Sequence, residues 1–250
     1  MRSVVFTDID ETLTRSARRS PPEPGAELVA TDREGAPTSY RSAAQGVFFQ
    51  WLDRADRVIP VTGRSLDAFR RVRLPFRAEA VVHHGAVILA EGGERDTTYH
   101  ELVAPELRAA DEVLAEAFAH VTAWIPRARV PLRVYRQVLD GLTAEVCVKP
   151  VDPEGRELGD GGDELETRWG GLAGVRVHRN GNNLALLPAG VDKGRAVEWL
   201  LDRLTDRLGP LVSLGVGDSA TDYDFLSRCD YYVVPSGSQL DACVGRGVSG

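Results

Sequence analysis

Cysteine is scarce in this sequence, and long apolar runs are missing from it. The three cysteines among 250 residues lie far apart, without a CxxC pair, at Cys147, Cys229 and Cys243. This spacing suggests neither a zinc knuckle nor a disulfide framework, and it favours a reducing, cytoplasmic setting. No segment approaches the roughly 18 consecutive apolar residues of a membrane-spanning helix. We therefore expect a cytoplasmic protein without a membrane partner.

An excess of positive charge, which nucleic-acid binding requires, is also lacking. The chain has 30 Lys and Arg against 37 Asp and Glu, a formal net charge of -7. Short basic runs at residues 15–19 and 70–73 are interpreted as solvated faces. The composition thus excludes broad attraction to nucleic acid or to an anionic membrane, and it is silent on the oligomeric state.

Segments that are present indicate an α/β fold. Each has a short run of β-branched or aliphatic residues, then polar residues, then a helical stretch; they are VVFTDID (4–10), VIPVTGRS (58–65), LVSLGVGDS (211–219) and YYVVPSGS (231–238). Strands that alternate with helices, such as those expected at 42–55 and 192–208, predict a Rossmann-like, doubly wound parallel sheet. Ligands of such sheets bind outside the carboxyl ends of the strands, where these polar residues fall.

A second domain is predicted inside the first. From Arg64 to Lys193 the chain runs 129 residues, whereas a βαβ crossover needs only about 30. The surplus predicts helices at 105–124 and 156–171, a hairpin that turns at Asp140-Gly141, and strands near 132–139, 142–150, 175–178 and 183–188. We expect residues 1–83 and 188–250 to form the catalytic core, and residues 84–187 to form an inserted, smaller α+β cap domain.

A smaller excursion separates Thr14 from Ser42. Asp-Arg-Glu-Gly at 32–35 stands between two short extended runs, which predicts a hairpin at the rim of the main domain. Such a hairpin could act as a flap over the first strand or could be a solvated excursion, and both interpretations stay open.

Acidic residues follow the apolar run of the first predicted strand, and their position requires an explanation. Burying a carboxylate is costly unless it is paired or bound to metal. Strand alternation puts Asp8 and Asp10 on the same side, two residues apart. One carboxylate can attack phosphorus to give an aspartyl-phosphate, while the other protonates the leaving alcohol and then deprotonates water. We assign the first role to Asp8 and the second to Asp10.

A carboxylate and a phosphate ester repel each other unless positive charge lies between them. Mg²⁺ suits this purpose because it prefers oxygen ligands and needs few carboxylates. Asp8 together with Asp218, in the turn after LVSLGVG, is predicted to hold it. Asp222 is predicted to hold a metal-bound water or to brace the site.

Phosphate-binding donors are predicted on two further segments. Lys193 can neutralise phosphate oxygens together with Asp8, and Thr62 with the amides of Gly63 and Arg64 can donate hydrogen bonds at a helix N-terminus. For the Arg64 side chain, a contact with substrate and a pairing with a core acid both stay open.

These motifs, in this order, resemble those of the haloacid dehalogenase superfamily of phosphatases. The matching segments are DIDET (8–12), VTGRS (61–65), the lysine of VDKGRA (191–196) and GDSATD (217–222). The resemblance implies a phosphoryl-aspartate mechanism with Asp8 as nucleophile, Asp10 as general acid/base and Thr12 steadying the first loop. It also implies that Asp10 gives a backbone carbonyl to the metal. The second aspartate, Asp10, favours a phosphatase over a dehalogenase.

An insertion between the second and third motifs resembles the branch that includes sucrose-phosphate, mannosyl-phosphoglycerate and trehalose-phosphate phosphatases and phosphomannomutases. It implies a small phosphorylated metabolite, a sugar or sugar-like phosphate, as the partner. Many members of that branch read NGA at cap entry and GDGxND in the fourth motif, where this chain has HHGA and GDSATD. His84 of HHGA stands at a position that faces substrate in relatives, so we expect a substrate contact there, and no relative's specificity carries over.

Three other functions compete with this one. A phosphomutase would share every core motif and return the phosphoryl group to the sugar. A non-catalytic receiver-like or metabolite-binding module would not need Asp10 or an inserted domain of about a hundred residues. Dinucleotide binding is disfavoured because GVGDSA lacks the third glycine of GxGxxG. The sequence therefore predicts a Mg²⁺-dependent phosphatase.

Overall fold

The computed structural model describes residues 2–151, 158–180 and 183–248 and shows two compact units. Unit 1 comprises Met1–Thr97 and Asp192–Gly250, and unit 2 comprises Thr98–Val191. The boundaries expected from the sequence, after residues 83 and 187, both lie earlier in the chain. The first junction falls later because Val87–Leu89 (β7) pairs antiparallel with Ala80–Val82 (β6) and so remains in unit 1.

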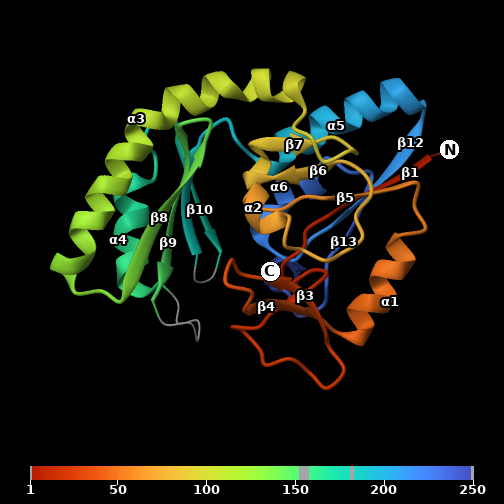
Figure 1. Ribbon diagram of the computed structural model, residues 1–250, viewed down its shortest axis with the longest axis horizontal. Coiled ribbons are helices and arrows are strands. Elements are labelled where there is room, and N and C mark those ends of the chain that lie inside the picture. Colours follow the sequence, from red (N-terminus) through yellow and green to blue (C-terminus); the bar gives the residue numbers. More distant parts are fainter. Residues whose placement is uncertain (1, 152–157, 181–182, 249–250) are drawn as a thin grey trace. The chain divides into compact units, whose positions relative to one another are not determined.

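A parallel sheet forms the centre of unit 1, as the sequence predicts. Its strand order is β13-β12-β1-β5 (Figure 1). The bounds are β1 (Arg2–Thr7), β5 (Arg57–Pro60), β12 (Leu211–Val216) and β13 (Tyr231–Val233). β1 pairs with β12 up to Thr7↔Val216 and with β5 up to Thr7↔Pro60. The carboxyl ends of these three strands therefore lie level, at one edge of the sheet.

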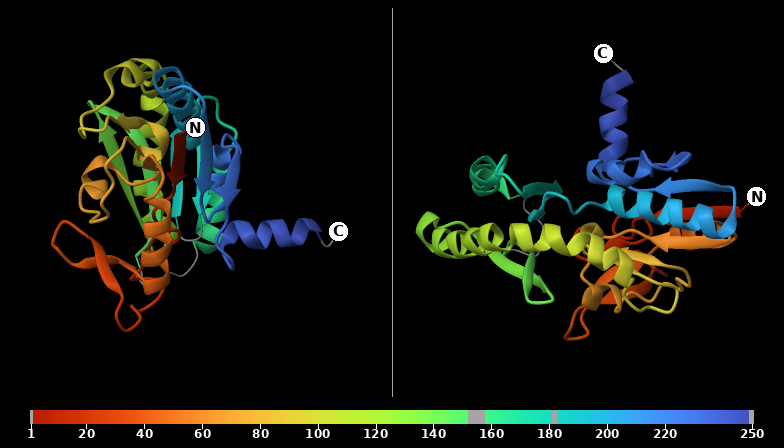
Figure 2. Two further views of the ribbon diagram at one scale, coloured as in Figure 1. Left: turned by 90° about the vertical axis from the view of Figure 1, so that its right-hand side faces the viewer. Right: turned by 90° about the horizontal axis from the view of Figure 1, so that it is seen from above.

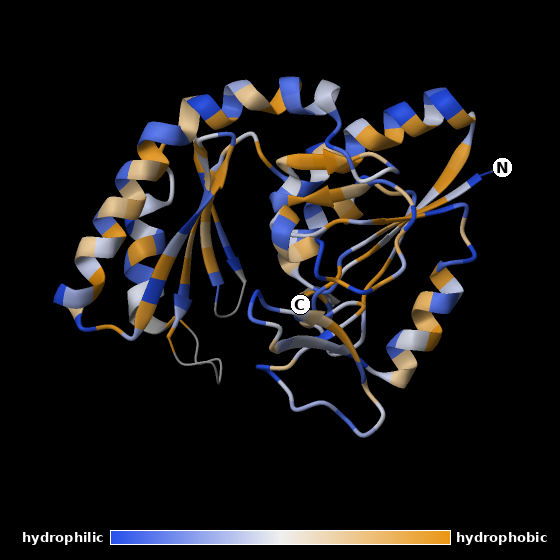
Figure 3. Cartoon of the chain, in the orientation of Figure 1, coloured by the Kyte–Doolittle hydropathy of each residue, from blue (hydrophilic) through white to orange (hydrophobic). Residues whose placement is uncertain are grey.

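Apolar side chains explain why β1 is central. Val4, Val5 and Phe6 are buried, which suits a strand with neighbours on both sides. Core strands of unit 1 are largely hydrophobic, whereas α5 (Lys193–Leu208) alternates between hydrophilic and hydrophobic residues along its length (Figure 3).

The helices and short helical turns of unit 1 are α1 (Ala43–Leu52), α2 (Leu66–Phe69), η1 (His83–Gly85), α5 (Lys193–Leu208), η2 (Ala220–Asp222), α6 (Tyr223–Leu226) and α7 (Gln239–Val248).

The excursion after β1 folds as a small antiparallel sheet, which we call the flap (residues 15–41). Its strand order is β2-β4-β3, with β2 (Arg15–Ser16), β3 (Glu27–Thr31) and β4 (Pro37–Arg41). Asp32 closes the β3–β4 turn, since its Oδ1 accepts from the amides of Glu34 (3.1 Å) and Ala36 (2.7 Å). The hairpin predicted here is confirmed.

Unit 2 is an antiparallel sheet with two helices. The strand order is β10-β11-β9-β8, and the elements are α3 (Thr97–Ala128), β8 (Leu132–Leu139), β9 (Leu142–Pro150), α4 (Gly159–Trp169), β10 (Val175–Asn180) and β11 (Asn183–Pro188). Asp140 and Gly141 have φ of 52° and 85°, as the predicted tight hairpin turn requires. Leu114 of α3 and Leu165 of α4 pack with Val146 of β9 in one core.

Helix α3 is longer than the sequence predicts. The sequence predicts a start at about residue 105, but the helix begins at Thr97 and passes through Pro105. Tyr99 and Val103, in the turns before the proline, are both buried. Burial of these side chains offsets the hydrogen bond that Pro105 cannot donate.

α7 extends away from the parallel sheet of its own unit (Figure 2), and near its start the amide of Leu240 donates to the carbonyl of Asp218 (2.8 Å). Cys147, Cys229 and Cys243 are free thiols, as predicted. Among the described residues no helix combines the length and the apolar character that a membrane span needs.

One close backbone approach places the start of α5. Gly85 has φ of 100°, and a Cβ built on it would lie 2.1 Å from the carbonyl oxygen of Asp192. Only glycine permits both this conformation and this contact. The turn at Gly85 therefore lies directly against the residue that precedes Lys193.

Replacing Gly85 tests this contact. We expect Gly85→Ala to lower the free energy of unfolding by at least about 2 kcal/mol, since it adds a backbone clash to the cost of about 1 kcal/mol for a left-handed alanine. Gly93→Ala is the matched control, because Gly93 has a φ of 87° and nothing within 4 Å of its built Cβ. Urea unfolding followed by circular dichroism measures both, and equal losses would contradict the importance of the contact.

Candidate active site

The loop that follows β1 carries the two predicted catalytic acids. The amide of Asp8 donates to the carbonyl of Val216 (2.8 Å), which continues the pairing of β1 with β12 beyond the strand. Asp8 is buried, whereas the Asp10 side chain is 43% exposed. Thr12 donates from Oγ1 to Oδ1 of Asp218 (3.1 Å) and so ties this loop to the turn after β12.

Lys193 is the first residue of α5, and its ammonium lies beside Asp8 and Asp222. The side chain of Asp192 caps the helix by accepting from the amide of Arg195 (2.7 Å). Nζ of Lys193 lies 2.8 Å from Oδ1 of Asp8 and 2.7 Å from Oδ1 of Asp222, and its side chain is 8% exposed. The contact of Lys193 with Asp8 that the sequence predicts is present.

Asp222 is held by a residue that the sequence reasoning missed. Its Oδ2 accepts from the amide (3.0 Å) and the hydroxyl (2.7 Å) of Ser219. Gly217 packs closely here, since a Cβ on it would lie 2.7 Å from Cβ of Asp222. The sequence signal was a serine three residues before an acid at the start of a helical turn, a pattern that is typical of a capping box.

Three buried carboxylates form a group that could hold a metal ion. Asp8, Asp218 and Asp222 each offer an oxygen within 4.8 Å of the others. Burial raises the pKa of Asp8 well above its usual range, Lys193 opposes this effect, and Asp222, Asp218 and Asp10 add to it. Each further negative charge therefore makes ionised Asp8 more costly.

The other members of the group show the same excess of negative charge. Burial, and next the charge of Asp222, raise the pKa of Asp218 to about 6, against the hydrogen bond from Thr12. Burial disfavours the charged form of Lys193, yet Asp222 and Asp8 outweigh burial and raise the pKa of its ammonium. One ammonium among three carboxylates leaves uncompensated negative charge, which a hard cation with oxygen ligands would neutralise.

A second set of predicted residues lies at the end of β5. Thr62 is buried, and its Oγ1 accepts from the amide of Arg64 (3.1 Å). Gly63 faces the ring of His84, because a Cβ on Gly63 would lie 2.3 Å from Cε1 of that ring. His84 has φ of 55°, and its amide donates to the carbonyl of Thr62 (3.2 Å). A side chain at position 63 would therefore displace the ring of His84.

Arg64 connects this second set with the loop of Asp10. Its Nε donates to Oδ2 of Asp10 (2.8 Å) and its Nη2 to Oδ1 (2.6 Å), so the guanidinium meets both carboxylate oxygens. Nη2 also donates to Oγ of Ser39 in β4 (3.0 Å). Of the two possibilities left open for Arg64, the structure shows the pairing with an acid. Ser39 was not expected, and no local pattern in the sequence marks it.

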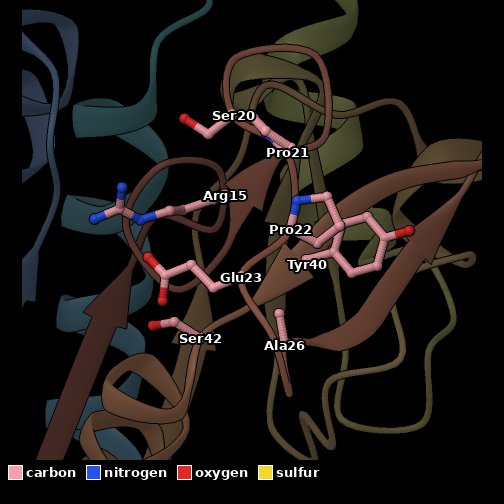
Figure 4. Close-up of a pocket in the computed structure, with 8 residues that line it drawn as sticks. All are labelled: Arg15, Ser20, Pro21, Pro22, Glu23, Ala26, Tyr40 and Ser42. Atoms are coloured by element: carbon pink, nitrogen blue, oxygen red, sulfur yellow. The ribbon is translucent and has the colours of Figure 1, made fainter.

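A separate small cavity lies within the flap and its connection to α1 (Figure 4). Its volume is about 120 Å³, and its lining residues are Arg15, Ser20, Pro21, Pro22, Glu23, Ala26, Tyr40 and Ser42. None of the predicted site residues is among them. The acidic group and this cavity are therefore different places in unit 1.

Comparison with known proteins was made by sequence and by structure. A scan against protein-family models and a search of curated proteins each give no match for this sequence. The sucrose-phosphatase of Synechocystis, in complex with sucrose and phosphate, is 16% identical, with a TM-score of 0.58; the match covers 100% of this chain and 98% of that chain. The C-terminal domain of a C. albicans trehalose-6-phosphate phosphatase is 18% identical, with a TM-score of 0.59; the match covers 90% of this chain and 73% of that chain.

A haloacid dehalogenase-like hydrolase from B. subtilis is 14% identical, with a TM-score of 0.56; the match covers 96% of this chain and 91% of that chain. These likenesses extend over nearly the whole chain, and at such identities they concern the fold. The parallel sheet of unit 1 and the separate antiparallel sheet of unit 2 agree with a core that carries a cap insertion. The chain therefore has the fold of the haloacid dehalogenase-like hydrolases, which trehalose-6-phosphate and sucrose-phosphate phosphatases share.

Proposed function

We propose that the protein is a Mg²⁺-dependent phosphatase that hydrolyses a small phosphorylated metabolite, a sugar or sugar-like phosphate, through an aspartyl-phosphate. The observation that carries this proposal is the buried pair of Asp8 and Lys193 beside Asp218 and Asp222, at the carboxyl end of the central strand. The fold shared with sugar-phosphate phosphatases supports the substrate class, and one of those enzymes has bound sucrose and phosphate.

The two acids of the first loop have complementary roles in this proposal. The carboxylate of Asp8 attacks phosphorus, and the bond from phosphorus to the ester oxygen breaks as Asp10 gives its proton to the leaving alkoxide. Asp10 then takes a proton from water, whose oxygen attacks the phosphoryl group. Inorganic phosphate leaves and the Asp8 carboxylate is restored.

Positive charge and donors surround the phosphoryl group in this scheme. Lys193 neutralises charge on Asp8 and on phosphate oxygens. Since Oγ1 of Thr62 accepts from the amide of Arg64, its own proton is available to a phosphate oxygen, as is the amide of Gly63. His84, packed against Gly63, is the proposed contact with the rest of the substrate.

The donor set fits a magnesium ion. The carboxylates of Asp8, Asp218 and Asp222, with the backbone carbonyl of Asp10, would hold it. When bound, Mg²⁺ supplies the charge that lets an anionic carboxylate approach an anionic ester.

A phosphomutase is the nearest alternative, because it would use the same groups and return the phosphoryl group to the sugar. Its product would be an isomer of the substrate without free phosphate. A non-catalytic receiver-like or metabolite-binding module would give neither product. Product analysis therefore separates the three functions.

Removing the proposed nucleophile is the central test. We expect Asp8→Asn to lower phosphate release from sugar phosphates at least about a thousandfold, because an amide cannot form the acyl-phosphate. Release is measured over a panel of phosphorylated metabolites, with Mg²⁺ and with a chelator. Asp202→Asn, at an exposed acid of α5, is the matched control and should retain full activity.

Two outcomes would contradict the phosphatase proposal. Full activity in folded Asp8→Asn would remove Asp8 from the mechanism. Isomerised sugar phosphate without free phosphate in the wild-type reaction would instead identify a mutase.

The brace on Asp222 yields a prediction about metal affinity. We expect Ser219→Ala to raise the Mg²⁺ concentration for half-maximal activity about 10- to 100-fold, because groups that orient metal ligands contribute about this much. Ser227→Ala is the control, since the exposed Ser227 hydroxyl donates only to the carbonyl of Asp224 among the contacts seen for it. An unchanged Mg²⁺ requirement in Ser219→Ala would show that metal binding does not depend on the hydrogen bond from the Ser219 hydroxyl to Asp222.

A further inference from the structure

The Arg64 side chain is bound to other residues of unit 1. Its guanidinium donates to both oxygens of Asp10 and to the hydroxyl of Ser39. The Arg64 side chain is only 15% exposed, and Ser39 is buried. We call Arg64, Asp10 and Ser39 together the Arg64 clamp.

The geometry of the clamp fixes the direction of the Asp10 carboxylate. Two parallel N–H donors in a planar fork allow a carboxylate one orientation, whereas a single point charge allows many. The backbone of Arg64 is itself held, because its amide donates to Thr62 Oγ1 (3.1 Å) and its carbonyl accepts from the amide of His83 (2.8 Å). The guanidinium therefore extends from a fixed base.

Ser39 brings the flap into the same network. Ser39 lies in β4, the middle strand of the three-stranded flap sheet. A second contact joins flap and loop, since the amide of Ser16 in β2 donates to Oε1 of Glu11 (3.0 Å). The loop after β1 is thus linked to the flap twice, directly through Glu11 and, from Asp10, through Arg64. These contacts favour the flap interpretation over a solvated excursion.

We propose that Arg64 is a positioning residue that aims the Asp10 carboxylate and couples it to the flap. Its effect on turnover rests on the proposed function, in which the Asp10 carboxylate takes the proton from the attacking water. The competing role is a direct contact of Arg64 with the substrate phosphate.

Steady-state kinetics distinguish the two roles. For a positioning residue we expect Arg64→Gln and Arg64→Lys to lower kcat about 10- to 100-fold, with KM changed less than about twofold, because small misplacements of a catalytic group cost this much. The matched control is Arg71→Gln: Arg71 also contacts the flap, through the carbonyl of Thr31 (3.1 Å), and pairs with Asp67, away from Asp10. Its kcat should equal that of the wild type.

A double variant tests whether Arg64 acts through Asp10. In the Asp10→Asn background, Arg64→Gln should cause no further loss of kcat, because the proton-transferring group is already gone. A multiplicative further loss, or a single variant that raises KM and leaves kcat unchanged, would overturn the positioning role in favour of substrate contact.

Hydrogen exchange tests the coupling to the flap without any assay of activity. We expect amides of residues 38–41 in β4 to exchange about tenfold faster in Arg64→Gln and in Ser39→Ala than in the wild type, with a smaller change in Arg71→Gln. Unchanged exchange in both clamp variants would overturn the coupling. If the wild type released no phosphate, the proposed function would fail, and the exchange result would still decide whether the clamp holds the flap.

Discussion

Buried negative charge is the constraint on which the architecture of the candidate site depends. Asp8, Asp218 and Asp222 lie close together out of water, where ionised carboxylates are costly unless a cation meets them. Lys193 supplies one positive charge, and it can do so because α5 begins where the backbone of Asp192 lies against Gly85. The tight turns and short contacts around the site hold these charges in place. Packing of apolar side chains alone would not require such turns and contacts.

Much of this arrangement could be predicted because it follows from local rules. Apolar runs that end in acids identify strands of a parallel sheet, and level strand ends bring Asp8 and Asp218 together without any knowledge of the intervening chain. Lys193 was predictable only as part of an ordered set of motifs, since a lysine in a first helical turn is usually solvated. The hairpin at Asp140-Gly141 and the Asp-Arg-Glu-Gly turn of the flap were likewise marked by their own residues.

What could not be predicted depends on partners that are remote in sequence or on packing. Arg64 and Asp10 are 54 positions apart, and Arg64 and Ser39 are 25 apart; no periodicity links them. The predicted start of α3 lies too late in the chain, because the earlier turns are stabilised by the burial of Tyr99 and Val103, which depends on tertiary packing. Ser219 lies between these cases, since its spacing to Asp222 is a recognisable cap whose importance appears only once Asp222 contacts Lys193.

The two acids of the first loop have different cations as partners, and the difference matches the work proposed for each. Asp8 is buried and shares a lysine ammonium with Asp222; an ammonium is a compact charge that several oxygens can approach together. Such a partner suits a nucleophile whose charge must be balanced while phosphate oxygens arrive. Asp10 is more exposed and meets the flat fork of Arg64, which fixes an orientation. A carboxylate that must remove a proton from one water molecule gains from a fixed orientation, so a lysine at position 64 would keep the positive charge and lose that orientation.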